Sequence, residues 1–231
     1  MLFWSQLRFT CEASIPHLWS KIVHGFALRS HKEIVYKAHL GLKKAFGQLN
    51  KAEGHIESFH GLQVAEEGPN NTYFISIWES SLLHRKFKEI SMVNRESDIA
   101  KQFEPLNEAV SVAGDRFFHH EFNLLKGTAI PGLESKTTEF VIITPKGGAS
   151  FDKVRETGLK VRDALESDGH PAAFAESVQG DGMFLMIVGW SSSTHHLNTV
   201  KEEPYVSLGK EFREVGISDV SHANLTKNHD Q

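Results

Sequence analysis

The residues in this sequence best suited to proton transfer are its histidines, because the imidazole changes charge near neutral pH. The sequence contains fourteen of them. Two of them, His84 and His196, each follow a tryptophan, Trp78 or Trp190, by six positions. Serines that suit a helix N-cap precede both, so each histidine is expected near the start of a helix. The helix dipole there favours the neutral imidazole, which either acts as a base or packs against neighbouring side chains. Because the position recurs, we interpret both as markers of a repeated fold.

The histidines without a counterpart are the better candidates for proton transfer. His60 lies in a strand-like stretch whose partner segment carries no histidine. His119 and His120 are consecutive in another such stretch, so their side chains face opposite sides, and His120 shares its side with Phe118 and Phe122. We therefore predict His60 and His120 as bases facing an interior cavity. The alternative is that both are core histidines held by hydrogen bonds.

The sequence predicts neither a metal nor an organic cofactor. His60 and His120 could share a metal ion, but two histidines without a placed carboxylate are a weak metal signal. The single cysteine, Cys11, excludes a disulfide framework and a cysteine-based zinc site. Lys146-Gly147-Gly148 follows a strand-like run without the rest of a phosphate-binding motif, so nothing supports flavin or nicotinamide.

The two Trp-to-His segments belong to a longer internal repeat. Tyr73 to His84 reads YFISIWESSLLH, and Leu185 to His196, 112 positions later, reads LMIVGWSSSTHH. Upstream, KAEGH ending at His55 matches ESDGH ending at His170, 115 positions later. The change of offset falls in a turn, where insertions are tolerated, which supports the alignment.

Each copy has the element order strand, helix, strand, turn, strand, helix, strand, which is that of the β-α-β-β-α-β ferredoxin-like fold. The last strands are expected at Arg116 to Leu125 and at Ser218 to Leu225. Thr138 to Thr144 is a clear first strand for the second copy, and the repeat places its partner near Ile22 to Arg29, a poor strand pattern. The first strand of copy one lies either there or earlier, in Leu2 to Thr10.

Both faces of the strand ending at Trp78 are apolar, so each sheet needs a cover on both sides. The simplest cover for one sheet is its twin. We therefore predict an α+β protein of two tandem ferredoxin-like repeats whose sheets face each other as an intramolecular dimeric α+β barrel. The expected division is a poorly matched N-terminal segment (1–20), a first repeat (21–125), a linker (126–136) and a second repeat (137–231).

These segments, with TEFVIIT and the EEPY stretch at Glu202 to Tyr205, resemble the antibiotic biosynthesis monooxygenase (ABM) family of dimeric α+β barrels, and in particular its two-repeat members from fungi. The resemblance covers roughly Lys32 to Lys227. It implies the fold, but not one activity, because the superfamily includes cofactor-independent monooxygenases, polyketide cyclases, muconolactone isomerases and haem-degrading enzymes.

The resemblance implies a protein that binds a small apolar or aromatic molecule inside the barrel, with Phe118, Phe122, Trp78 and Trp190 as candidates to line the cavity. Two classes remain open. One is a cofactor-independent monooxygenase or cyclase-like enzyme with a histidine base. The other is a non-catalytic ligand-binding or protein-interaction module with structural histidines. Haem is disfavoured, since His84 does not lie where an axial ligand is expected.

The composition gives no sign of a nucleic-acid or membrane partner. The formal net charge is −4, 40% of residues are hydrophobic and 23% are charged, without a basic patch. We find no signal-peptide pattern and no apolar run of membrane-spanning length, so the expected location is the cytoplasm. The chain is expected to be a monomer by internal duplication, or a homodimer.

Overall fold

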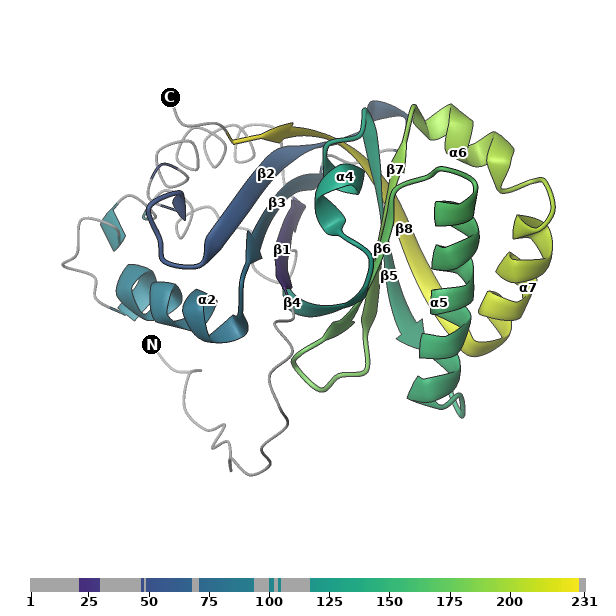
Figure 1. Ribbon diagram of the computed structural model, residues 1–231, viewed down its shortest axis with the longest axis horizontal. Helices are drawn as coiled ribbons and strands as arrows, with labels where there is room; N and C mark the ends of the chain where they lie inside the picture. The colour runs from purple at the N-terminus through teal and green to yellow at the C-terminus, as the bar shows by residue number, and fades with distance from the viewer. Residues whose placement is uncertain are drawn as a thin grey trace.

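The computed structural model describes residues 21–29, 47, 49–67, 71–93, 100, 101, 104 and 117–228. Within these ranges the strands form one closed antiparallel barrel in the order β1-β3-β2-β8-β5-β7-β6-β4 (Figure 1). The bounds are β1 (Ile22–Arg29), β2 (His55–Gln63), β3 (Asn71–Trp78), β4 (Phe117–Lys126), β5 (Thr137–Pro145), β6 (Ala172–Ser177), β7 (Phe184–Trp190) and β8 (Gly216–Lys227).

The barrel consists of two equivalent half-sheets, β4-β1-β3-β2 and β8-β5-β7-β6. When the four strands of a repeat are numbered along the chain, their order across the half-sheet is 4-1-3-2 in both repeats, which is the order of the ferredoxin-like fold. At each seam the second strand of one repeat pairs with the last strand of the other, as β2 with β8 and β6 with β4. The predicted fold, two repeats whose sheets close on each other, is confirmed.

The first strand of the first repeat is Ile22–Arg29, which begins 115 positions before β5, at the offset that the repeat predicted. Its weak pattern is tolerated because it lies in the middle of its half-sheet, paired along its length with β3 on one side and β4 on the other. The alternative location, Leu2 to Thr10, lies outside the described residues.

Helices cover the outer faces of the barrel. On the second repeat they are α5 (Phe151–Ser167), α6 (Ser193–Thr199) and α7 (Tyr205–Val215), and on the first α2 (Ser81–Lys88) lies at the opposite end of the molecule (Figure 1). The predicted serine caps are present: Ser80 accepts a hydrogen bond from the backbone N–H of Leu83, and Ser192 accepts one from that of His195. These caps fix where α2 and α6 begin.

The inner faces of the two half-sheets meet in one cluster of buried apolar side chains. The cluster includes Phe59, Ile75, Phe122, Phe140 and Ile187, and α4 (Ala129–Leu133), within the predicted linker, adds Ala129 and Leu133 to it. A second cluster joins the outer face of the second repeat to its helices. Both faces of β3 and β7 are therefore buried, as their apolar sequences predicted.

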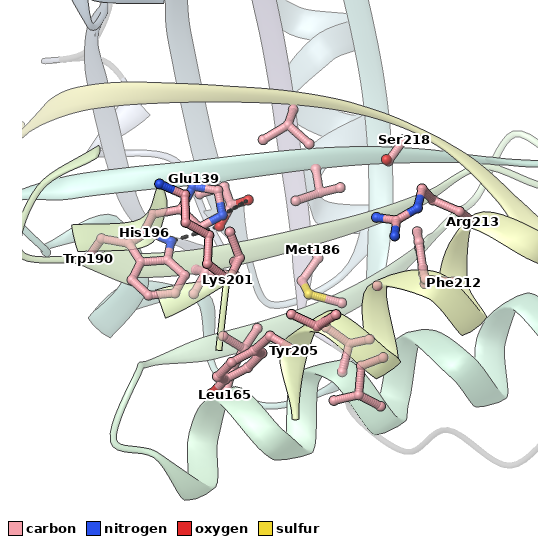
Figure 2. A pocket seen from close by; sticks show the side chains of 18 residues that line it. Glu139, Leu165, Met186, Trp190, His196, Lys201, Tyr205, Phe212, Arg213 and Ser218 are labelled. Carbon is pink, nitrogen blue, oxygen red and sulfur yellow. Dashed lines mark hydrogen bonds and ion pairs between the residues drawn. The ribbon is translucent and has the colours of Figure 1, made fainter. Parts of the chain in front are cut away.

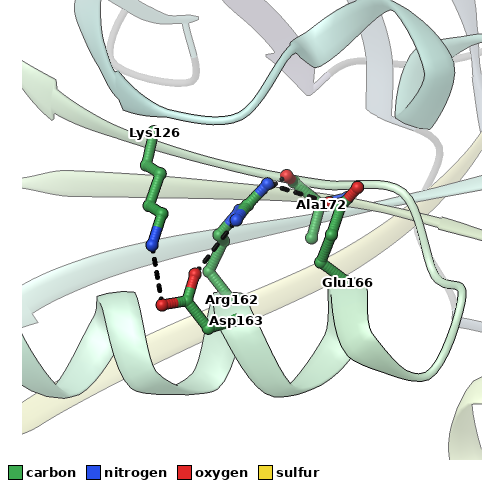
Figure 3. Close-up of polar contacts among 5 residues, drawn as sticks. All are labelled: Lys126, Arg162, Asp163, Glu166 and Ala172. Carbon is green, nitrogen blue, oxygen red and sulfur yellow. Dashed lines mark hydrogen bonds and ion pairs between the residues drawn. The ribbon is translucent and has the colours of Figure 1, made fainter.

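A network of ion pairs fastens α5 to the sheet (Figure 3). The guanidinium of Arg162 donates to the carbonyl oxygen of Ala172 at 3.1 Å and to the carboxylate of Glu166 at 2.9 Å. The carboxylate of Asp163 accepts from the ammonium of Lys126, at the end of β4, at 2.8 Å. The network lies beside the β4–β6 seam and holds α5 over it.

None of the helices in the described part of the chain is long and apolar enough to cross a membrane.

Candidate functional site

A cavity of about 530 Å³ lies on the outer face of the second repeat, between strands β5, β7 and β8 and helices α5, α6 and α7 (Figure 2). It is outside the barrel, whereas the sequence predicted a cavity inside. Its middle is apolar, lined by side chains such as Leu165, Met186, Val188 and Phe212. A cavity of this size and composition suits a small, largely apolar molecule.

One end of the cavity is polar and buried. Glu139 on β5, Trp190 on β7 and His196 on α6 all line it, and each is at most 8% exposed. The indole N–H of Trp190 donates to Oε2 of Glu139 at 2.7 Å, and Nε2 of His196 lies 3.4 Å from Oε1 of the same carboxyl. The carboxyl of Glu139 is therefore held between an indole and an imidazole.

The polar end continues away from the cavity through His222 on β8. Nε2 of His222 lies 2.8 Å from Nδ1 of His196, at hydrogen-bond distance. The carboxylate of Glu67, on the 3-10 helix η1 (Ala65–Glu67), bonds Nδ1 of His222 and accepts from its backbone N–H at 2.8 Å. A continuous line of polar groups thus runs from the second repeat to a residue that follows β2 of the first repeat.

Burial shifts the pKa of each of the two groups nearest the cavity in the direction that favours its neutral form. Burial raises the pKa of Glu139 from 4.5 to about 7, although the hydrogen bond from Trp190 and the charge of His222 oppose it. Burial, helped by the nearby charge of His222, lowers the pKa of His196 to about 4. At neutral pH, Glu139 is partly protonated beside a neutral imidazole, so either group can exchange a proton with a molecule in the cavity.

The far side of the cavity carries positive charge. Arg213 on α7 is exposed and lines the cavity there, and Figure 2 shows it beside Ser218, across Met186 from Glu139. The exposed Lys201 lies at the polar end instead, near Trp190 and His196. Tyr205 also lines the cavity; burial and the hydrogen bond to Asp168, at 2.6 Å, raise its pKa. The cavity therefore offers a proton-exchanging group at one end and a cation at the other.

The first repeat has a related polar pair. In it a carboxylate, Glu121 on β4, occupies the strand position that the imidazole of His222 occupies on β8 of the second repeat. Nδ1 of His84 lies 3.1 Å from Oε1 of Glu121. Glu121 is opposite His24 in the β1–β4 register, as His222 is opposite Glu139 in the β5–β8 register. Burial would raise the pKa of Glu121, but the hydrogen bond and the charge of His84 outweigh it and lower that pKa. Glu121 is thus held toward its ionised form, whereas burial holds Glu139 of the second repeat toward its protonated form.

His60 and His120, the predicted bases, lie on strands at opposite edges of the first half-sheet and do not meet. His60 is opposite Phe74 in the β2–β3 register, on the outer face, while the neighbouring Phe59 points inward. His120 shares the inner face with Phe122, as predicted, and its Nε2 lies 2.8 Å from the carboxylate of Asp181. Neither lines the cavity between the second half-sheet and its helices.

The four aromatic residues predicted to line one cavity are separated by the structure. Trp190 lines the cavity, but Phe122 is part of the barrel interior. Trp78 is completely buried on the other outer face, against His84 and Phe87. The side chain of Phe118 lies outside the described residues. The separation arises because Trp78 and Trp190 point out of the barrel, each toward the helices of its own repeat.

His84 and His196 lie at equivalent places, each buried beside the tryptophan that precedes it, with ring centroids 5.1 and 4.9 Å apart. His196 also lines the cavity, so it belongs both to the repeated fold and to the candidate site. Sequence reasoning missed Glu139, Glu67 and His222, which the strand register makes the counterpart of Glu121. A signal was present: Glu139 is the one charged residue in the apolar run TEFVIIT.

Replacing Glu139 by glutamine is expected to stabilise the protein at high pH only. The folded-state pKa of about 7 exceeds the ordinary 4.5, so stability is lost as the pH rises from 4.5 through 7. The loss reaches at most about 3 kcal/mol. Urea unfolding should therefore show Glu139→Gln more stable than the unchanged protein at pH 8 but not at pH 4.5. The exposed Glu214→Gln is the control, and an equal difference at both pH values would contradict the assignment.

The structure is similar to several solved structures. A proposed monooxygenase from Fusobacterium nucleatum matches with a TM-score of 0.61 at 10% identity, covering 90% of this chain and 94% of that one. One from Lactobacillus acidophilus matches with a TM-score of 0.57 at 13% identity, covering 91% and 95%. An anthrone oxidase-like protein matches with a TM-score of 0.58 at 11% identity, covering 92% and 94%.

No protein-family profile matches the sequence, and no curated protein is significantly similar to it in sequence. At these identities the structural likeness speaks for the fold alone. It agrees with the architecture that the resemblance to the ABM family implied. The chain therefore has the dimeric α+β barrel fold of ABM-like proteins, with both halves of the barrel in one polypeptide.

Proposed function

We propose that the protein binds a small aromatic molecule in the cavity of the second repeat and removes a proton from it through Glu139 and His196. The observation that carries the proposal is a buried carboxyl whose pKa is about 7, at the polar end of an otherwise apolar cavity. A base whose pKa lies near the working pH combines a useful ionised fraction with a sufficient driving force for proton transfer.

The lining of the cavity indicates the kind of ligand. The apolar middle suits fused rings, and Trp190 provides an aromatic wall at the buried end. A ligand with an acidic C–H or O–H group toward Glu139 and a carbonyl or carboxylate toward Arg213 would satisfy both polar ends. Aromatic ketones of the anthrone type have this combination, and 1-naphthol provides fused rings with the acidic O–H alone.

Proton removal is the step that the cavity's own residues supply. Glu139 takes the proton from the ligand, and His196 stays hydrogen-bonded to His222 and holds the carboxyl from the other side. The resulting anion is electron-rich enough to react with dioxygen without a flavin. The descriptions of the similar structures, two proposed monooxygenases and an anthrone oxidase-like protein, support this choice of reaction class.

Haem does not fit this end of the cavity. Nδ1 of His196 faces His222 at 2.8 Å and Nε2 faces Glu139 at 3.4 Å, so neither ring nitrogen is directed at open space where an iron porphyrin would lie. We therefore propose a reaction without haem. The alternative function is non-catalytic binding of the same ligand class, with the polar groups serving only recognition.

Ligand binding can be tested by following the tryptophan fluorescence of the full chain while 1-naphthol or anthrone is added. Gly209 on α7 lines the cavity, and a leucine there fills it while favouring the helix. Gly209→Leu should weaken binding at least about tenfold. Lys210→Leu, the exposed neighbour outside the lining, should not change it. Equal binding by all three proteins would place the ligand elsewhere and refute the cavity assignment.

Catalysis needs an assay of its own, apart from the binding assay. We would measure the uptake of dioxygen and the change in absorbance as anthrone is consumed. Glu139→Gln should bind anthrone as before but turn it over at least about 100-fold more slowly, because it cannot accept the proton. Binding without any turnover in the unchanged protein would favour the non-catalytic alternative. A haem absorption band in the purified protein would overturn the proposal that the reaction proceeds without haem.

A further inference from the structure

Three side chains at the polar end of the cavity have the donor set of a transition-metal site. Glu139, His196 and His222 each offer a ligand atom, and these atoms lie within 4.8 Å of one another. All three residues are buried, at 5%, 8% and 2% exposure. They come from β5, α6 and β8, so the arrangement is made by the tertiary fold and not by a local run of polar sequence.

We propose that Glu139, His196 and His222 bind one divalent transition-metal ion such as Zn²⁺. Two imidazoles and one carboxylate form a common protein site for such ions, with further positions left for water or a ligand. Nδ1 of His196 and Nε2 of His222 are 2.8 Å apart. Two nitrogens that each lie about 2.1 Å from a tetrahedral Zn²⁺ are about 3.4 Å apart, so the two rings need to separate by only about 0.6 Å to hold one ion.

The groups around the donors hold them by hydrogen bonds, as neighbouring residues do in metal sites. Metal-bound histidine usually gives its other ring N–H to a carboxylate, which fixes the ring and the tautomer. Glu67 provides this contact to Nδ1 of His222 and leaves Nε2 facing His196. Trp190 donates to Oε2 of Glu139 and leaves Oε1 on the side of His196. Two of the three ligands are thus oriented before any ion binds.

Charge and access also suit a divalent cation. The mostly buried cluster contains two carboxyl groups, Glu139 and Glu67, and their ionised forms would balance one divalent ion. Glu139 and His196 line the cavity, so its interior leads directly to the donors. An ion there would have its remaining coordination positions on the cavity side, where an oxygen atom of a bound molecule could reach it.

The metal site goes beyond the proposed proton transfer and is independent of it. Without a metal, the same three side chains form a hydrogen-bonded cluster in which Glu139 accepts protons. With a metal, the donor atoms are occupied, so binding of Zn²⁺ should stop turnover that depends on Glu139 as a base. Metal binding is measured on the protein without substrate, so it can succeed or fail whatever the outcome of the anthrone assay.

The test uses the full chain, freed of metal with a chelator and titrated with Zn²⁺ in a calorimeter and with Co²⁺ by visible absorbance. One equivalent should bind tightly, with Co²⁺ giving the bands of a low-symmetry nitrogen and oxygen site. Glu139→Gln and His222→Gln should each remove the tight equivalent. Glu67→Gln keeps the three ligands but loses the carboxylate that orients His222, and it should weaken binding about 10- to 100-fold.

His195→Ala is the matched control, because His195 is the exposed neighbour of His196 on the same helix and offers the same chemistry at the surface. It should leave the tight equivalent unchanged. Circular dichroism establishes that each variant is folded. Absence of a tight equivalent in the unchanged protein, or its persistence in folded Glu139→Gln and His222→Gln, would overturn the proposal.

Discussion

Acidification from pH 6.5 to pH 4 is expected to unfold this protein cooperatively, because three of its histidines are folded into sites that favour the neutral ring. Burial lowers the pKa of His55, His119 and His196 from 6.5 to about 4 in each case. The unfolded chain binds these three protons below pH 6.5, whereas the folded chain does so only near pH 4. The contribution of these three rings to stability is therefore complete above pH 6.5 and is lost as the pH falls toward 4.

The expected size of this effect is comparable with the whole stability of a domain. Each shift corresponds to at most about 3 kcal/mol. The values for His55 and His119 are smaller, since water reaches part of each ring and screens the charge. Together the three sites approach the roughly 5–15 kcal/mol that keeps a typical domain folded. Glu139 acts in the opposite direction, but it is one group against three.

The measurement is an acid titration followed by circular dichroism and tryptophan fluorescence. The midpoint should fall between pH 4 and 6.5, and His119→Gln should move it to lower pH, since that ring no longer takes up a proton on unfolding. His195→Gln, at an exposed position, should leave the midpoint in place. A protein that stays folded at pH 4 with unchanged stability would show that these rings are protonated without cost.

The fold could be predicted from the sequence because the pattern of most strands and helices occurs twice, once in each repeat. The strand ending at Trp78 and the one ending at Trp190 support each other, and the shared Gly-His at the end of each first helix fixes the alignment. The glycines of these pairs, Gly54 and Gly169, both adopt positive φ, at 78° and 84°. Only Ile22–Arg29 was left open, since its pattern is weak and its stability depends on pairing with β3 and β4.

The candidate site could not be predicted in the same way. Strand alternation correctly grouped His120 with Phe122, but it cannot say which face of a strand lies inside when both faces are buried. The polar cluster depends on the β2–β8 seam, which brings Glu67 to His222 across 155 positions of sequence. A contact made only when the barrel closes has no local pattern, so sequence reasoning favoured the unshared histidines over Glu139.

Replacing Gly61 by alanine is expected to destabilise the barrel by more than about 3 kcal/mol, because the change acts on the seam that closes it. Gly61 lies on β2, opposite Leu225 of β8. A β-carbon there would lie 2.1 Å from the carbonyl oxygen of Asn224, which is a backbone atom held in the sheet. No side-chain rotation relieves the clash, so β8 must move away from β2.

The other seam has a glycine in a similar position. Gly127 follows β4, has a φ of +84°, and a β-carbon on it would lie 2.4 Å from the carbonyl oxygen of Ala172, the first residue of β6. Gly127→Ala therefore combines a backbone clash with a strained conformation. Each seam of the barrel thus needs one position without a side chain, at Gly61 within β2 and at Gly127 just after β4.

Urea unfolding followed by tryptophan fluorescence compares the two seam variants with Gly147→Ala, whose β-carbon meets nothing within 4 Å. The control should change the free energy of unfolding by less than about 0.5 kcal/mol. If the halves of the barrel unfold as one unit, Gly61→Ala and Gly127→Ala should lower the midpoint of a single transition. Two separate transitions would instead mean that each repeat keeps its own stability once a seam is weakened, and a midpoint equal to that of the control would refute the close approach at the seams.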